Sequence, residues 1–188
     1  MGDGEICDVA SSAICEARSM SSNATTRIET ERLVLAPLEI GDATHMVTVL
    51  ADSALYSFTG GDPPTFEALE ARHRAQLSGS LNEGEIWHNW IVRLVATGEA
   101  TGYVQATVIA GSADVAWVIG TGWQRMGIAR EAAAAMCRWL REQGATRITA
   151  HIHPRHQASA AVANACGLRE TPEIDDDGEH VWAFDPER

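Results

Sequence analysis

The alternation of apolar and polar residues along the chain predicts a mixture of strands and helices. Several segments combine β-branched or aromatic residues with a period of two, and turns containing glycine separate three of them. Strands are predicted at residues 27–36, 87–96, 101–110, 113–119 and 147–152. The Asp177-Gly178 turn also predicts a hairpin between residues 173–174 and 180–184. The three consecutive strands are expected to form an antiparallel meander.

Four segments have apolar residues at helical spacing. The first follows Asp42, which we expect to cap it, and the second follows the turn at Pro63-Pro64. The third runs from Gly127 to a left-handed cap at Gly144, and the fourth covers residues 157–166 before Gly167. Helices interleaved with strands in this order predict a mixed α/β sheet.

The length of 188 residues, with 45% hydrophobic content, predicts one domain over residues 27–188. Residues 1–26 are small, polar and partly acidic, so we expect a disordered extension without a secretory signal, and Met20 is a candidate natural start. No apolar run approaches the roughly 20 residues that cross a bilayer. The four cysteines lack Cys-x-x-Cys spacing, which favours a reducing cytoplasm over a zinc site or disulfide framework.

The net charge of −12 argues against nucleic-acid or membrane partners and favours cationic ones. The chain contains no lysine, so all 14 basic residues are arginine, and lysine Schiff-base chemistry is excluded. Because the net charge is negative, any phosphorylated ligand must be bound by local groups rather than by the overall field of the protein.

An anion cradle is predicted where the strand at residues 113–119 runs through a short loop into a helix. Amides in a first helical turn lack partners, and the macrodipole adds about half a positive charge there. Gly127 and Ala129 are small enough for a phosphate to approach, and Arg125 and Arg130 add charge.

Two common phosphate motifs do not fit this loop. A dinucleotide fingerprint fails because Arg125 stands where its third glycine belongs. A nucleoside-triphosphate loop fails because Ile128 and Ala129 replace its lysine and hydroxyl residue.

The segment Gln124-Arg-Met-Gly-Ile-Ala129 resembles the Gln/Arg-x-x-Gly-x-Gly/Ala pyrophosphate loop of the GNAT superfamily of N-acetyltransferases. Residues 30–38, followed by Asp42-Ala, are similar to the opening of its RimJ/RimL-type branch, and residues 148–168 to its closing strand and helix. The resemblance implies a GNAT acyltransferase fold, whose central, mostly antiparallel sheet has splayed strands and about four flanking helices. It also implies acetyl-CoA as the cosubstrate.

The resemblance also implies which residues bind the cofactor. Val118 and Ile119 would contact pantetheine through their main chains, and the Ile119 N–H would polarise the thioester carbonyl. His156 stands where the branch usually has a cofactor-contacting asparagine. The residues that would hold the pyrophosphate are Gln124, Arg125, Met126, Gly127, Ile128, Ala129 and Arg130.

Amine acetylation requires a neutral amine, and deprotonation at pH 7 costs about 4 to 5 kcal/mol for a lysine-like amine but only about 1 to 1.5 for an α-amine. Asp114 stands where many GNAT sequences carry a general base, although it is equally consistent with a solvated carboxylate that begins a strand. Ser159 would lie near the sulfur, or has an ordinary role in a first helical turn. Ala163 replaces the tyrosine acid of many relatives. Less well placed bases are Glu83, Glu85, His88 and Glu131.

A loop at residues 58–64 and several aromatic residues are predicted to line the acceptor pocket, where rings beside carboxylates suit a cation. Tryptophans are more often core residues, which is the competing interpretation. The predicted acceptor-binding residues are Trp87, His88, Trp90 and Trp117. His151, His153 and His156 lack a carboxylate or cysteine at a metal-binding spacing, so no metal site is predicted.

Three functions are consistent with these residues. The first is acetylation of the α-amine of a protein or peptide, and the second is acetylation of a small cationic amine such as an antibiotic or metabolite. The third is a non-catalytic, acetyl-CoA-binding regulatory protein, favoured by His156 and the missing tyrosine. The protein is expected to be a monomer or homodimer.

Overall fold

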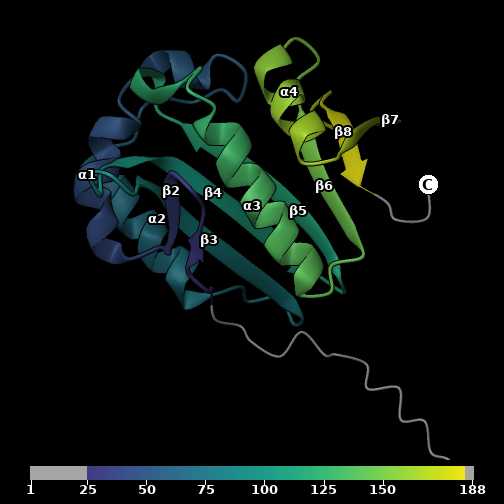
Figure 1. Ribbon diagram of the computed structural model, residues 1–188, viewed down its shortest axis with the longest axis horizontal. Helices are drawn as coiled ribbons and strands as arrows, with labels where there is room; N and C mark the ends of the chain where they lie inside the picture. Colours follow the sequence, from purple (N-terminus) through teal and green to yellow (C-terminus); the bar gives the residue numbers. More distant parts are fainter. Residues whose placement is uncertain (1–24, 185–188) are drawn as a thin grey trace, which may run out of the picture.

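An eight-stranded, mostly antiparallel sheet forms the centre of the computed structural model, which describes residues 25–184 (Figure 1). Its strand order is β1-β2-β3-β4-β5-β6-β8-β7. The strands are β1 (Ile28–Glu29), β2 (Leu33–Pro37), β3 (Glu85–Leu94), β4 (Ala100–Ile109), β5 (Ser112–Ile119), β6 (Arg147–Ile152), β7 (Arg169–Ile174) and β8 (His180–Phe184). The predicted meander is confirmed as β3, β4 and β5, and the predicted hairpin as β7 and β8.

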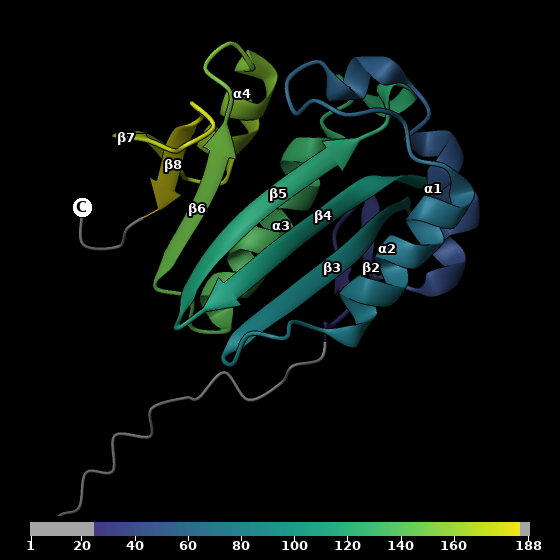
Figure 2. The same cartoon turned by 180° about the vertical axis from the view of Figure 1, so that it is seen from behind.

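Four α-helices and three short 3-10 helices complete the fold: η1 (Ile40–Asp42), α1 (Ala43–Val49), η2 (Ser53–Tyr56), α2 (Phe66–Ser78), η3 (Thr121–Trp123), α3 (Ile128–Glu142) and α4 (Gln157–Ala165). Figure 1 shows α3 lying across one face of the sheet, and Figure 2 shows α1 and α2 on the other face. The alternation of side chains along β3 follows this division. Trp90 packs in the core under α3, whereas Ile91 packs with α1 and α2.

The sheet opens between β5 and β6. These two strands are parallel, and they pair only through Ser112↔Arg147, Ala113↔Ile148 and Asp114↔Thr149. Beyond this point β5 continues for five residues and β6 for three without pairing to each other. We call this region the splay, and its closed end at Asp114 and Thr149 the apex. The splayed sheet expected from the resemblance is therefore present.

The first predicted strand, residues 27–36, is wrong in one respect, because the chain folds back on itself at Thr30. β1 and β2 pair with each other, and the Thr30 amide donates to the Leu33 carbonyl across the turn at 2.9 Å. The predicted cap at Asp42 is also wrong. The carboxylate of Asp42 accepts instead from the Glu39 amide at 2.8 Å and forms an ion pair with Arg93.

The predicted disordered extension over residues 1–26 needs revision at its end. Residues 1–24, including the candidate start at Met20, lie outside the described residues. Thr26 is part of the packed fold, because its carbonyl accepts from the Trp90 indole at 2.7 Å, and the Thr25 hydroxyl lies 3.2 Å from Nδ1 of His88. Among the helices formed by residues 25–184, none has the length and apolar character of a membrane span.

Candidate active site

Main-chain amides of β5 point into the splay at alternate residues. The Gly120 amide donates to the Thr101 carbonyl at 2.9 Å, so even-numbered residues of β5 direct their polar groups toward β4. Trp117 and Ile119 therefore direct theirs away from β4, toward the splay. Val118 has the opposite orientation, so of the two residues expected to contact pantetheine through the main chain, only Ile119 faces the splay.

Gly102 on β4 sets the spacing of this strand pair. A Cβ at Gly102 would lie 2.1 Å from the Val118 carbonyl oxygen and 2.8 Å from the Ile119 Cα. Only glycine allows this approach, and it fixes the end of β5 that leads into the predicted cofactor loop.

The loop between β5 and α3 adopts left-handed backbone at two positions. Arg125 has φ of 60°, and Gly127, which precedes the helix, has φ of 79°. The first helical hydrogen bond runs from the Glu131 amide to the Gly127 carbonyl at 3.1 Å, so the amides of residues 128–130 have no acceptor within the helix. This end of α3 has the geometry that an anion requires.

Most predicted pyrophosphate-binding residues are accessible at this loop. The Gln124 amide group donates to the Ile119 carbonyl at 3.0 Å and joins the loop to the strand. Ile128 is buried in the core, so only its main chain is available to a ligand. The accessible residues are Gln124, Arg125, Met126, Gly127, Ala129 and Arg130, of which Ala129 is half-buried.

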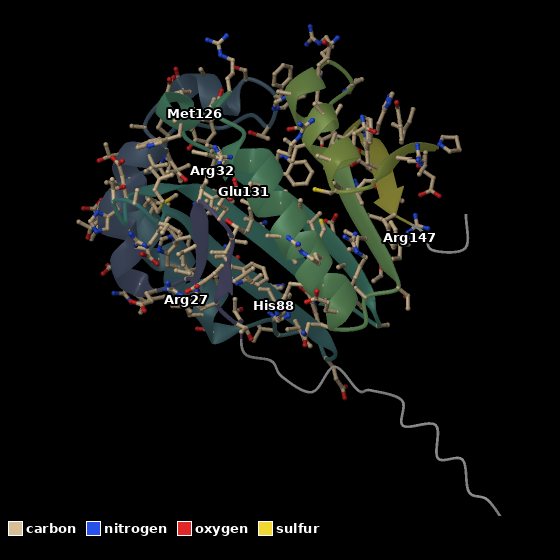
Figure 3. The ribbon with its side chains drawn as sticks, viewed as in Figure 1. Arg27, Arg32, His88, Met126, Glu131 and Arg147 are labelled. Atoms are coloured by element: carbon tan, nitrogen blue, oxygen red, sulfur yellow. The ribbon has the colours of Figure 1, made fainter. Side chains whose placement is uncertain are left out.

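An ion pair between Arg32 and Glu131, which the sequence did not reveal, anchors the loop (Figure 3). Arg32 bonds Glu131 through Nε and Nη2 at 2.7 and 2.6 Å, and its Nη1 donates to the Met126 carbonyl at 3.1 Å. The Thr30 hydroxyl donates to the same carboxylate at 2.6 Å. Burial alone would raise the pKa of Glu131, but the hydrogen bonds from Thr30 and Arg32 outweigh it and lower the pKa. Glu131, considered above as a base, therefore binds Thr30 and Arg32 and has a structural role.

A second cluster of polar side chains lies at the apex. The Asp114 carboxylate accepts from the Thr149 hydroxyl at 3.3 Å and lies 3.8 Å from Nε2 of His151. Its side chain keeps 56% of its surface exposed, yet the surrounding protein atoms desolvate it enough to raise its pKa, against the opposing influence of His151 and Thr149. On its other side, His151 bonds Asp175 through Nδ1 at 2.6 Å.

Asp114 and the Ile119 amide are too far apart to serve the same reacting carbon directly. Five residues separate them, or about 16 Å at about 3.3 Å per residue. The Trp117 amide points the same way as Ile119 and is about 10 Å from Asp114 along the strand. A base at Asp114 and an oxyanion donor at Ile119 would therefore have to be connected through water, as the bases of many relatives are.

The other side of the splay is formed by β6 and α4. His156 caps α4, since its Nδ1 accepts from the Ser159 amide at 3.4 Å, and its ring stacks on Phe58 with 4.3 Å between centroids. Burial and the neighbouring His153 lower the pKa of His156, so the neutral ring that can accept is favoured. Ser159 lies in the first turn of α4, and Ala163 is fully buried.

The four predicted acceptor-binding residues do not lie together. His88 and Trp90 are 1% and 0% exposed and pack against Trp139 of α3, so the core interpretation offered for the tryptophans is correct for Trp90, and His88 is a core residue too. Trp117 is half-buried against the same core. Trp87 faces the opposite side of the sheet, where its indole donates to Glu85.

A cavity of about 250 Å³ opens between α2 and the α1/α2 face of the sheet. Residues of α2, β3 and β4 line it, among them Arg72, Gln76, Asn89, Tyr103 and Gln105. The strand register continues this lining toward the splay, because Asn89 pairs with Gln105 and Gln105 with Ala116. The cavity and the apex thus share one face of the sheet.

The three histidines considered as a metal site do not converge. His151 turns toward Asp114 and Asp175, while the rings of His153 and His156 lie against Phe58. Over residues 25–184, no three side chains are arranged to ligate a metal ion.

Comparisons with known proteins agree with this geometry. The family described as Acetyltransferase (GNAT) domain matches residues 32–169. A comparison with curated protein sequences finds no match.

Solved structures share the fold at low sequence identity. A GNAT-family acetyltransferase from Bacillus anthracis is 20% identical, with a TM-score of 0.72 over 87% of this chain and 100% of its own. A candidate ribosomal-protein-serine acetyltransferase from Vibrio cholerae is also 20% identical, with a TM-score of 0.70 over the same shares. The ribosomal-protein-S5-alanine acetyltransferase from Vibrio fischeri is 18% identical, with a TM-score of 0.71 over 85% of this chain and 96% of its own. With a family match over most of its length and the splayed sheet, the chain belongs to the GNAT acetyltransferases.

Proposed function

We propose that this GNAT acetyltransferase transfers the acetyl group of acetyl-CoA to the α-amine of a protein or peptide. One observation carries the proposal: the β5 edge that faces the splay leads directly into the exposed first-turn amides of α3. A ligand with an extended amide-containing arm and a diphosphate at its end matches both features.

The main chain supplies most of the proposed cofactor contacts. Amides of residues 128–130 and the side chains of Arg125 and Arg130 bind the diphosphate. Pantetheine pairs with the β5 edge as an added strand would, and Ile119 contributes the main chain that faces the splay. His156 and Ser159 approach the arm from α4.

We assign the oxyanion contact to the Trp117 amide rather than to Ile119. Trp117 directs its N–H toward the splay and lies nearer to the polar groups at the apex. A donor fixed in the strand stabilises the developing negative charge without reorganising. The Asp114 carboxylate then contacts the acceptor amine, and Ser159 donates a hydrogen bond to the departing sulfur.

Two observations favour a peptide acceptor. The row of amide side chains from Asn89 and Gln105 toward the apex offers donors and acceptors to a peptide main chain. Structural neighbours include proteins described as ribosomal-protein-serine and ribosomal-protein-S5-alanine acetyltransferases. A small cationic amine is the second candidate, because carboxylates surround the apex.

Calorimetry with acetyl-CoA, followed by detection of released CoA thiol, tests the proposal. The acceptor panel contains peptides beginning with Ser or Ala, the same peptides with a blocked α-amine, polyamines and aminoglycosides. We expect cofactor binding and turnover only with free α-amines. Turnover confined to small amines would overturn the peptide assignment, and binding without turnover on any acceptor would favour the non-catalytic regulatory protein.

A further inference from the structure

His151 lies on the surface of the splay between two carboxylates from different elements. Asp175, in the turn between β7 and β8, bonds its Nδ1 at 2.6 Å, and Asp114 of β5 lies 3.8 Å from its Nε2. We propose that His151 is the base that takes the proton from the acceptor amine, with Asp175 as its positioning residue and Asp114 binding the ammonium form. This inference rests on the proposed function.

Along the strand direction, the backbone of His151 lies nearer than that of Asp114 to the proposed oxyanion donor. Asp114 pairs with Thr149 in parallel register, and continuing that register by two residues brings His151 level with Ala116, one residue from Trp117. This offset along the strand is about 3 Å, compared with about 10 Å for Asp114, and the two side chains approach each other to 3.8 Å. Ala116, the residue level with His151, has a small and exposed side chain.

Asp175 fixes which nitrogen of His151 is free. Its carboxylate accepts from the Glu179 and Asp177 amides at 2.9 and 3.0 Å, and these bonds hold it in place. The Glu179 amide and then His151 lower the pKa of Asp175, so it remains ionised and accepts from Nδ1–H. In a neutral His151, Nε2 then carries the lone pair and faces Asp114.

The gap between His151 and Asp114 fits an amine. A separation of 3.8 Å is too long for a direct hydrogen bond, whereas a nitrogen placed beside it can contact both Nε2 and the carboxylate. Thr149 hydrogen-bonds Asp114, and the nearest arginine on β6, Arg147, is paired with Glu173 at 3.4 Å.

The proton balance of the step is complete without another reactant. Nε2 takes one proton from the ammonium group and releases it to solvent, since the side chain is 37% exposed. The neutral nitrogen attacks the thioester carbon, forming the C–N bond, and the C–S bond breaks with its electron pair leaving on sulfur. The second proton passes from nitrogen to the thiolate, so the products are the N-acetyl compound and CoA thiol.

A histidine base selects for the class of amine. An α-amine has a pKa of about 8 and a lysine side chain one of about 10.4. Proton transfer to the same base is therefore about 250-fold more favourable from an α-amine than from lysine. We call the pair of His151 and Asp175 the relay. It suits the α-amine that the proposed function names.

The decisive comparison is His151→Gln against His180→Gln. His180 also pairs with a carboxylate, Glu170, but lies on the other face of the neighbouring strand. With a Ser-initiated peptide at pH 7, we expect His151→Gln to lower kcat/KM about 100-fold, while His180→Gln stays at the wild-type rate. At pH 9 the deficit of His151→Gln should shrink below about tenfold, because most α-amine is already neutral.

Three results would overturn the relay: a wild-type rate for His151→Gln at pH 7, the same loss at pH 7 and pH 9, or an equal loss in His180→Gln. Calorimetry with acetyl-CoA should give affinities within about twofold of wild type for both variants, which separates a folding defect from loss of the base.

Nitrogen NMR of the His151 ring tests the relay without turnover. In the neutral ring we expect the Nδ1–H tautomer in the wild type and its loss in Asp175→Asn. An Nε2–H tautomer in the wild type would overturn the relay. Absence of acetyl-CoA binding to the wild type would instead overturn the proposed function, whichever tautomer is found.

Discussion

Arg32 and Glu131 are 99 residues apart in the chain, and their side chains form an ion pair with 2.6 Å between Nη2 and Oε2. The pair joins the turn before β2 to the first turn of α3. Because Arg32 also donates to the Met126 carbonyl, it links the proposed diphosphate loop to the helix that follows it.

We expect Glu131→Gln to lower the free energy of unfolding by about 1 to 2 kcal/mol. Hydrogen bonds to charged groups contribute about 1.5 to 3 kcal/mol, and the half-exposed Arg32 side chain reduces this by solvent screening. Affinity for acetyl-CoA should fall about fivefold as the loop loosens. Urea denaturation and calorimetry measure the two effects. Glu142→Gln, at the exposed end of the same helix, is the matched control and should change neither.

Gly127→Ala should weaken acetyl-CoA binding about tenfold, equivalent to about 1.4 kcal/mol. An alanine at φ of 79° is strained, and its Cβ would lie 3.3 Å from Nη2 of Arg32. Gly122→Ala, which has open space and no positive φ, should bind as the wild type does. Equal affinities for the two variants in calorimetry would contradict a ligand held by this loop.

Gly102→Ala should destabilise the protein by about 1 to 3 kcal/mol. The new Cβ meets main-chain atoms of Val118 and Ile119, which cannot move without separating β4 from β5. Urea denaturation measures the loss, and Gly41→Ala, which meets nothing within 4 Å, is the control. A variant as stable as Gly41→Ala would show that the strand pair tolerates separation.

His156→Asn should flatten the dependence of Tm on pH below about pH 6.5, the ordinary pKa of an imidazole. Burial, followed by His153, lowers the pKa of His156 below that of the unfolded chain, so the unfolded state takes up the proton first as pH falls. The wild type therefore loses stability on acidification through this range, whereas asparagine still caps α4 and does not titrate. An unchanged slope in thermal melts of the variant would exclude His156 as the cause.

Local patterns predicted most elements of the fold. The meander, α3 and the closing hairpin follow from periodicity and from turn residues, and Gly144 and Gly167 have the positive φ expected of residues that end a helix. The turn between β1 and β2 at Thr30 was missed because Glu131, which the Thr30 hydroxyl contacts, is about a hundred residues away in the chain. Nothing in the sequence near Thr30 indicates such a contact.

The site was less predictable because a motif carries no register. The pyrophosphate loop was predicted from six consecutive residues, yet the distance between Asp114 and Ile119 depends on which strands pair and where they separate. His88 and Trp90 are two residues apart, so the sequence indicates that they share a face of β3. Only the packing of α3 decides that this face belongs to the core. His151 and Asp175 meet because β8 returns beside β6, which neither segment indicates alone.

Three residue pairs are all that join β5 to β6, so a bound acetyl-CoA would act as a surrogate strand. Exchange of the Trp117 and Ile119 amides with heavy water should then slow when the ligand is present. On this view the protein completes its own sheet only while it carries the acetyl donor.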